Sequence, residues 1–284
     1  MYNLRVNEDD LIRAISPNDE IFAGDRLVPD WYWFVGRSAM EVIGNCLLAA
    51  KKPASEITSV LDLPCGHGRV LRYLKAAFPH AELTACDIVK DAVDFCASTF
   101  GATPVYSHQA PSRIPFQQDA FDLIWVGSLF THLDARLWKG FLSRLASSLR
   151  PGGLLIFTTH GRHVYNRVKG IEDPYDYHLP YWRTTALTYD YERMAFGYGD
   201  YLGQKYGVSL SDPVWVCSEI AAQDELRLVY FAERSWHGVQ DVYACMRSRH
   251  PHILNTSTPW SLYVKHRIRE VLRPRTPRDG NGTQ

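Results

Sequence analysis

Two aspartates and two glycines have the types and spacing of a ligand-binding strand–loop–helix unit. The apolar run that begins at Val60 ends in Asp62, and the chain then passes through Gly66 and Gly68 into an amphipathic stretch. Glycine permits a tight turn and a close approach of the backbone to a ligand. Asp87 ends the next predicted strand about 20 residues later, a spacing typical of a carboxylate that accepts hydrogen bonds from both ribose hydroxyls. These residues predict a nucleoside-binding site.

Two classes of cofactor use such a site. A dinucleotide fingerprint, G-x-G-x-x-G, that starts at Gly66 requires a third glycine at position 71, where this chain has Leu71. The ordered set of motifs therefore favours a nucleoside cofactor without a pyrophosphate. A nicotinamide-dependent oxidoreductase, which would bind a dinucleotide, is kept as the alternative function.

A parallel sheet is needed to bring these residues to one edge. Between Ile57 and Thr159, short apolar runs alternate with amphipathic stretches, which is the pattern of strand–helix–strand units. Upstream, a helix is predicted over Trp31–Ala50 and a shorter one near Glu8–Ile15. The predicted fold class is α/β: a three-layer Rossmann-like sheet, mostly parallel with an antiparallel last strand, with a helical N-terminal cap and a lid insertion.

The rest of the chain divides by composition. Two strands, Leu226–Glu233 and Val239–Met246, are predicted to complete the sheet as a hairpin. We therefore predict the following units: a helical cap over 1–55, a core over 56–160, a tyrosine-rich lid over 161–212, C-terminal strands over 213–250 and a basic, partly disordered tail over 251–284.

Composition limits the functional classes. Lysine and arginine number 31, as do aspartate and glutamate, so the net charge gives no attraction to a nucleic acid. No apolar run approaches the roughly 20 residues that span a bilayer, and the N-terminus has no apolar signal segment. The six cysteines form no CxxC pair, which fits reduced thiols in the cytoplasm. The basic tail leaves open a weak contact with an anionic membrane, although such stretches are more often solvated.

The motifs together resemble those of the class I S-adenosylmethionine-dependent methyltransferases. The segment LDLPCGHG stands at the place of their first motif, usually written LDxGCGxG, with Pro64 in place of a glycine, and FDLIWVGSLF and LRPGGLLIF follow in order. The likeness covers residues 56–160 closely and 213–247 in outline. It implies S-adenosyl-L-methionine as the cofactor and a sheet of seven strands.

The resemblance also implies which residues bind the cofactor. Its methionine end would lie near Asp62 to Gly68, its ribose on Asp87 and its adenine beside Ile88, with Gln109 or Ser107 available to the adenine amino group. The complete predicted set is Asp62, Pro64, Cys65, Gly66, Gly68, Asp87, Ile88, Gln109, Val126 and Gly127.

Methyl transfer to a hydroxyl needs a base close to the acceptor. Histidine is suited because its ordinary pKa, about 6.5, allows proton uptake near neutrality. Three histidines lie at predicted strand ends or bends: His132, His160 and His237. No metal is predicted, because the pair His160 and His163 has no evident third ligand.

The acceptor is predicted from the aromatic residues around the sheet. Tyrosine and tryptophan between Tyr165 and Tyr206, with the cluster Trp31–Phe34, suit stacking against a sugar or an aromatic metabolite. We therefore predict O-methylation of a small molecule or saccharide, with a place in polysaccharide biosynthesis. The same aromatics could form a subunit contact in a homo-oligomer. A catalytically silent S-adenosylmethionine-binding scaffold is a further alternative, and it requires all three histidines to lie away from the cofactor cleft.

Overall fold

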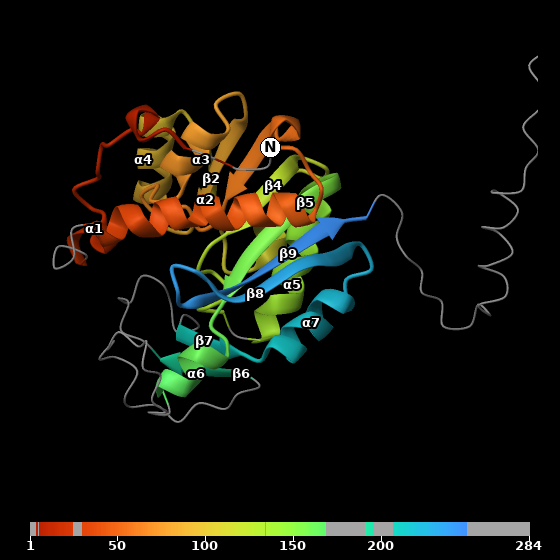
Figure 1. The fold of residues 1–284 in the computed structure, drawn as a ribbon. Helices are drawn as coiled ribbons and strands as arrows, with labels where there is room; N and C mark the ends of the chain where they lie inside the picture. The colour runs from red at the N-terminus through yellow and green to blue at the C-terminus, as the bar shows by residue number, and fades with distance from the viewer. Residues whose placement is uncertain are drawn as a thin grey trace, which may run out of the picture. The chain divides into compact units, whose positions relative to one another are not determined.

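A seven-stranded sheet lies at the centre of the computed structural model (Figure 1), which describes residues 4, 6–24, 30–133, 135–168, 191–195 and 207–248. The strand order is β3-β2-β1-β4-β5-β9-β8. Strands β1 to β5 are parallel, whereas β9 runs antiparallel to both of its neighbours. The predicted α/β sheet with an antiparallel last strand is confirmed. The strands are β1 (Ser59–Asp62), β2 (Glu82–Asp87), β3 (Thr103–Tyr106), β4 (Phe121–Val126), β5 (Leu149–Thr159), β8 (Leu226–Trp236) and β9 (Gln240–Arg247).

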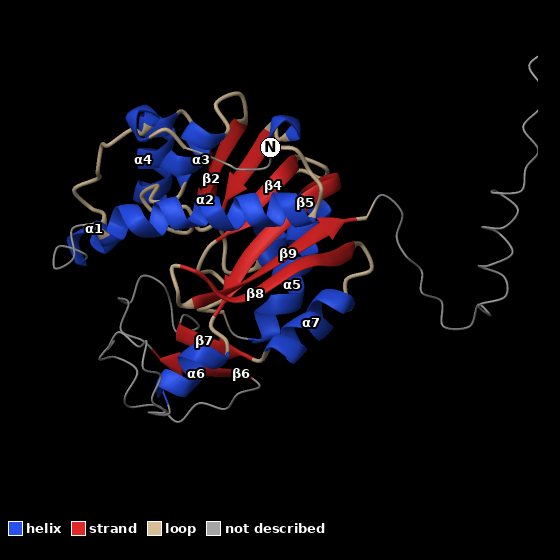
Figure 2. Cartoon of the chain, in the orientation of Figure 1, coloured by secondary structure: helices blue, strands red, loops and turns tan. Residues whose placement is uncertain are grey.

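Helices cover both faces of this sheet, as Figure 2 shows. Successive residues of a strand point to opposite faces, so Val60 packs on one side and Leu61 on the other. One apolar cluster joins the first side to α2 (Trp31–Ala49), α3 (Leu71–Ala77) and α4 (Lys90–Phe100). A second cluster joins the other side to α5 (Ala135–Ser148) and α7 (Pro213–Ala221). Because these central strands are covered on both faces, every residue of β1 and β4 is buried and neither strand alternates between buried and exposed positions.

The N-terminal region differs in part from its prediction. Helix α2 agrees with the predicted span to within one residue, but the segment Glu8–Ile15 contains only the 3₁₀ turn η1 (Glu8–Asp10). The backbone carbonyls of Ile12 and Ala14 accept hydrogen bonds from the Arg72 side chain instead of closing helical turns. A short helix, α1 (Glu20–Gly24), follows. Two further 3₁₀ turns are η3 (Ala54–Glu56) and η4 (Pro111–Arg113).

Between β5 and α7 the structure describes α6 (Arg162–Val168) and a two-stranded antiparallel sheet of β6 (Tyr191–Ala195) and β7 (Gly207–Ser211). Most of the aromatic residues on which the acceptor prediction depends, and the whole of 251–284, lie outside the described residues. Helix α7 occupies a stretch predicted to contain only strands. Its start is signalled by Asp212, whose carboxylate accepts from the Val214 and Trp215 amides, and by Pro213 at the first helical position.

No helix within the described ranges is long and apolar enough to cross a membrane.

Candidate functional site

A cavity of about 1210 Å³ lies at the carboxyl ends of the parallel strands. Its wall includes residues that directly follow β1, β2, β3 and β4, and it lies where the chain order of the sheet reverses between β1 and β4. Open α/β sheets bind ligands at such a reversal point. The predicted site residues in its wall are Pro64, Cys65, Gly66, Asp87, Ile88, Gln109, Gly127 and His132.

The loop from β1 to α3 is held by contacts with β2 and α4. The Gly66 amide donates to Asp87 Oδ2 over 2.8 Å, and the Cys65 amide donates to the Cys86 carbonyl over 3.0 Å. The Cys96 thiol reaches the Gly66 carbonyl at 3.3 Å, and the Leu63–Pro64 peptide bond is cis. The loop is thus bonded to β2 and α4, and Pro64, Cys65 and Gly66 line the cavity.

Gly68 explains why this loop requires glycine. Its φ of +82° lies in the left-handed region, and a Cβ atom built there would approach the Phe100 ring to 2.4 Å. Gly68 is outside the cavity wall, so its role is to let the loop pack against α4. Val126, another predicted cofactor residue, is fully buried and also lies outside the wall.

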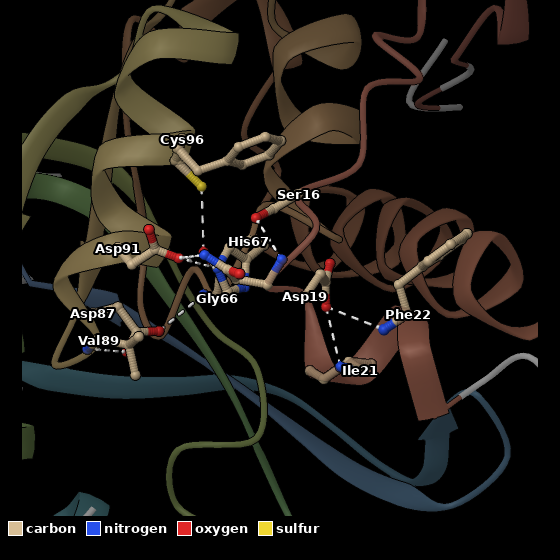
Figure 3. Close-up of polar contacts among 12 residues, drawn as sticks. Ser16, Asp19, Ile21, Phe22, Gly66, His67, Asp87, Val89, Asp91 and Cys96 are labelled. Atoms are coloured by element: carbon tan, nitrogen blue, oxygen red, sulfur yellow. Dashed lines mark hydrogen bonds and ion pairs between the residues drawn. The ribbon is translucent and has the colours of Figure 1, made fainter. Parts of the chain in front are cut away.

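The two predicted carboxylates differ in their partners. Asp87 is 6% exposed, and its oxygens accept from the Gly66 and Val89 amides (Figure 3). Asp62 is 1% exposed, and within the described residues its Oδ2 has no hydrogen-bond partner. Burial raises the pKa of both carboxyls, and the neighbouring Asp87 raises that of Asp62 further.

These groups fit the cofactor that the resemblance implies. The Asp87 oxygens retain acceptor capacity for ribose hydroxyls. The unpartnered Asp62 oxygen, directly before the cavity-lining Leu63, is suited to a cationic donor such as an α-ammonium group. Ile88 and Gln109 lie in the same wall, where an adenine ring would have an apolar surface and an amide.

The three predicted histidines occupy different environments. His132 lines the cavity. His160 and His237 lie outside its wall, although His237 follows the cavity-lining Trp236. Burial, followed by the nearby His132 and His237, lowers the pKa of His160 to about 3. Burial, followed by Arg69, lowers the pKa of His237 to about 3. Only His132 thus combines access to the cavity with a place beside the strand ends.

Sequence reasoning missed one whole side of the cavity. Residues 17–21, which precede and begin α1, line it together with the glycine loop. Trp125 and Trp236 also belong to the wall and lie edge to face, with ring centroids 5.2 Å apart. His67 and Arg69 lie within the glycine motif and could have been found from it, whereas nothing periodic marks 17–21.

Comparison with known proteins agrees with this site. Residues 60–153 match the model of a methyltransferase domain family. The malonyl-(acyl-carrier protein) O-methyltransferase 2 of Ilyobacter polytropus is 26% identical over 137 residues, which are 48% of this chain and 51% of that protein. The fatty-acid O-methyltransferase of Mycolicibacterium smegmatis is 32% identical over 100 residues, covering 35% and 36%. The chain thus spans about half the length, or less, of these relatives.

A solved structure shares the fold. The S-adenosylmethionine-dependent methyltransferase from Clostridium acetobutylicum aligns with a TM-score of 0.54, at 15% identity, over 81% of this chain and 98% of its own. The matched domain, the glycine loop and the strand order together support a class I S-adenosylmethionine-dependent methyltransferase, and the solved structure shows that the fold is shared.

Proposed function

We propose that this protein transfers a methyl group from S-adenosylmethionine to an oxygen atom of a small acceptor. The observation that carries the proposal is that one cavity holds both Asp87, suited to a ribose, and His132, suited to proton transfer. Its volume of about 1210 Å³ exceeds the usual range of ~300–1,000 Å³ for a single-ligand pocket, which supports two ligands side by side.

Different residues of the cavity wall would bind the cofactor and transfer the proton. When bound, S-adenosylmethionine supplies an electrophilic methyl group. Asp87 and the loop around Gly66 would fix its position, because alignment of the reacting atoms contributes a large part of such rate enhancements. His132 would accept the proton of an acceptor hydroxyl. A catalytically silent scaffold requires all three histidines to lie away from the cleft, and His132 lies in its wall.

Two classes of acceptor are candidates, a saccharide and an acyl group. A saccharide was predicted from aromatic residues that lie mostly outside the described ones. The names of the two relatives refer instead to malonyl and fatty-acid groups, which supports an acyl acceptor as the second candidate. A hydroxyl acceptor needs the His132 base, whereas a carboxylate acceptor is already ionised at neutral pH.

Calorimetry with S-adenosylhomocysteine tests the cofactor assignment. Asp87→Ala should weaken binding by about 1–3 kcal/mol through the loss of charge-assisted hydrogen bonds. Asp94→Ala is the matched control, because this helix α4 carboxylate bonds Tyr106 and lies outside the cavity wall. Absence of heat with the wild-type protein, or equal binding by both variants, would overturn the assignment.

A labelled-methyl assay tests the acceptor. Transfer from labelled S-adenosylmethionine should be measured with free fatty acids, acyl thioesters, nucleotide sugars and oligosaccharides. Base-stable incorporation into a sugar supports ether formation at a hydroxyl, whereas base-labile incorporation into an acid supports a methyl ester. A raised melting temperature with NAD(H) but not with S-adenosylhomocysteine would instead favour the oxidoreductase alternative.

A further inference from the structure

A buried arginine connects the two walls of the cavity. Arg72, in α3, is 1% exposed and directs its guanidinium among the rings of Tyr32, Trp33 and Phe100. A guanidinium has five N–H donors, and this one makes five hydrogen bonds. Its charge and all of its hydrogen-bonding capacity are therefore committed to neighbouring segments.

The partners of Arg72 belong to separate parts of the chain. Arg72 Nε donates to the Gly68 carbonyl over 3.0 Å, and Nη2 donates to the His67 carbonyl over 3.4 Å, which fixes the glycine loop. Nη1 donates to the carbonyls of Ile12 and Ala14, both over 3.0 Å, which fixes the N-terminal strap, defined here as residues 11–21. One side chain thus holds the glycine loop and the strap together.

The last bond of Arg72 extends this connection to the part of the strap that lines the cavity. Nη2 donates to the Tyr32 hydroxyl over 3.3 Å, and that hydroxyl donates to Asp19 Oδ2 over 2.8 Å. Asp19 Oδ1 accepts from the amides of Ile21 and Phe22 and so begins α1 (Figure 3). The position of the cavity wall at 17–21 therefore depends on Arg72 through Tyr32.

A second contact joins the same two segments at the cavity rim. Asp91 Oδ2 lies 3.1 Å from His67 Nε2 in the glycine loop (Figure 3). The same oxygen accepts from Asn18 Nδ2 in the strap over 3.0 Å. This carboxylate is exposed, so water weakens the contact, whereas the Arg72 bonds are shielded from solvent. Arg72 is accordingly the stronger of the two connections.

We infer that Arg72 is a positioning residue for the cofactor: it sets the distance between the glycine loop and the strap, so that both close on the nucleoside as one unit. The inference rests on the proposed function, because it assumes that this cavity binds S-adenosylmethionine. It assigns Arg72 no contact with the reacting atoms.

The test compares two arginines that both bond backbone carbonyls beside a ring. Arg144 bonds the carbonyls of Ile114 and Phe116 and lies over the Phe116 ring, and none of these three residues lines the cavity. Arg72→Met and Arg144→Met should both lower the melting temperature. Only Arg72→Met should raise the Kd for S-adenosylhomocysteine, by about tenfold or more, since each bond to a charged donor contributes on the order of one factor of ten.

Kinetics and hydrogen exchange separate positioning from general destabilisation. Arg72→Met should raise KM for S-adenosylmethionine while leaving KM for the acceptor unchanged. S-adenosylhomocysteine should slow amide exchange across residues 12–21 in the wild type and in Arg144→Met, but not in Arg72→Met. If Arg72→Met does not fold, Tyr32→Phe replaces it, because it removes only the hydroxyl between Arg72 and Asp19, and a several-fold rise in Kd is expected.

The outcomes distinguish the inference from the proposed function. A wild-type protein that does not bind S-adenosylhomocysteine overturns both. A wild-type protein that binds, with unchanged Kd in the folded Arg72 or Tyr32 variant or with an equal rise in Arg144→Met, overturns the positioning role alone.

Discussion

The cofactor side and the acceptor side of the cavity are stabilised in different ways. On the cofactor side, both oxygens of Asp87 accept from backbone amides, and the glycine loop is bonded to β2, α3 and α4. On the proposed acceptor side, which we define as His132 in the cavity wall together with β7 and the paired residues Thr159 and Asp241 outside that wall, buried oxygens of Thr159, Ser211 and Asp241 have no hydrogen-bond partner within the described residues. Buried polar groups without partners cost free energy, and three such oxygens lie here against one, Asp62 Oδ2, on the cofactor side, so the cost is larger on this side.

The contacts of β7 show which part of the chain covers the acceptor side. The Ser209 amide donates to the Thr131 carbonyl over 2.7 Å, and the Ser211 amide donates to the His160 carbonyl over 2.8 Å. The acceptor side is thus covered by a segment inserted after β5, whereas the cofactor side is assembled by the first half of the sheet.

The largest expected effect lies on the acceptor side. For a hydroxyl acceptor, His132→Ala should lower kcat by about 10²–10⁴-fold, the usual contribution of a general base, with an unchanged Kd for S-adenosylhomocysteine. The exposed His80, replaced by alanine, is the control. Rates within threefold of wild type would show that His132 is not the base, or that the acceptor is already ionised.

The next largest effect is expected on the cofactor side, where a substitution in the glycine loop should lower stability. Gly68→Ala should lower the free energy of unfolding by about 2–4 kcal/mol, because a Cβ at a φ of +82° is strained and meets Phe100. Gly101→Ala is a matched control: its φ is +68°, but no atom lies within 4 Å of the added Cβ, so only about 1 kcal/mol is expected. Chemical denaturation of both variants measures the difference, and equal losses would exclude the Phe100 contact as its cause.

A smaller effect depends on pH. Burial raises the pKa of Asp241, on the acceptor side, to about 7, well above its value in an unfolded chain. The folded state therefore retains a proton that the unfolded state has lost, so stability should decrease from about pH 4 to about pH 7 and then level off. Asp241→Asn should remove this slope and raise the free energy of unfolding at pH 8 by about 1–3 kcal/mol.

Asp122, at the amino end of β4, is a control, because its substitution should change the free energy of unfolding in the opposite direction. Burial would raise its pKa, but hydrogen bonds from Thr58 and Arg150 outweigh burial, and the net pKa is lowered. Its stabilising contribution is present above the unfolded pKa and is lost as the pH falls through the folded one. Asp122→Asn should therefore destabilise the protein at pH 8. Destabilisation by both variants would contradict the difference between the two carboxylates.

Features that depend on neighbouring residues could be predicted from the sequence, whereas features that depend on distant contacts could not. The sheet, its antiparallel last strand and the glycine loop follow from local patterns, because a strand end and its loop are adjacent in the chain. The strap does not, since the carbonyls of Ile12 and Ala14 bond Arg72, about 60 residues away, and a helix was wrongly expected there. Tertiary contacts of this kind override local propensity.

The acceptor side was harder to predict for a related reason. His132, His160 and His237 are equivalent by their place at strand ends or bends, and their differences in burial depend on distant elements packed beside them. Helix α7 is a different case, because Asp212 and Pro213 provide a local start signal that could have been used.

The smallest expected effect tests whether the acceptor side contains one functional histidine or two. His160→Asn should leave kcat within about threefold of wild type, because a base with a pKa near 3 takes up a proton poorly at neutral pH. The pH dependence of kcat should likewise be unchanged, whereas the melting temperature should fall because a buried side chain is altered. If His160→Asn instead lowered kcat a hundredfold while His132→Ala did not, proton transfer would belong to the buried histidine.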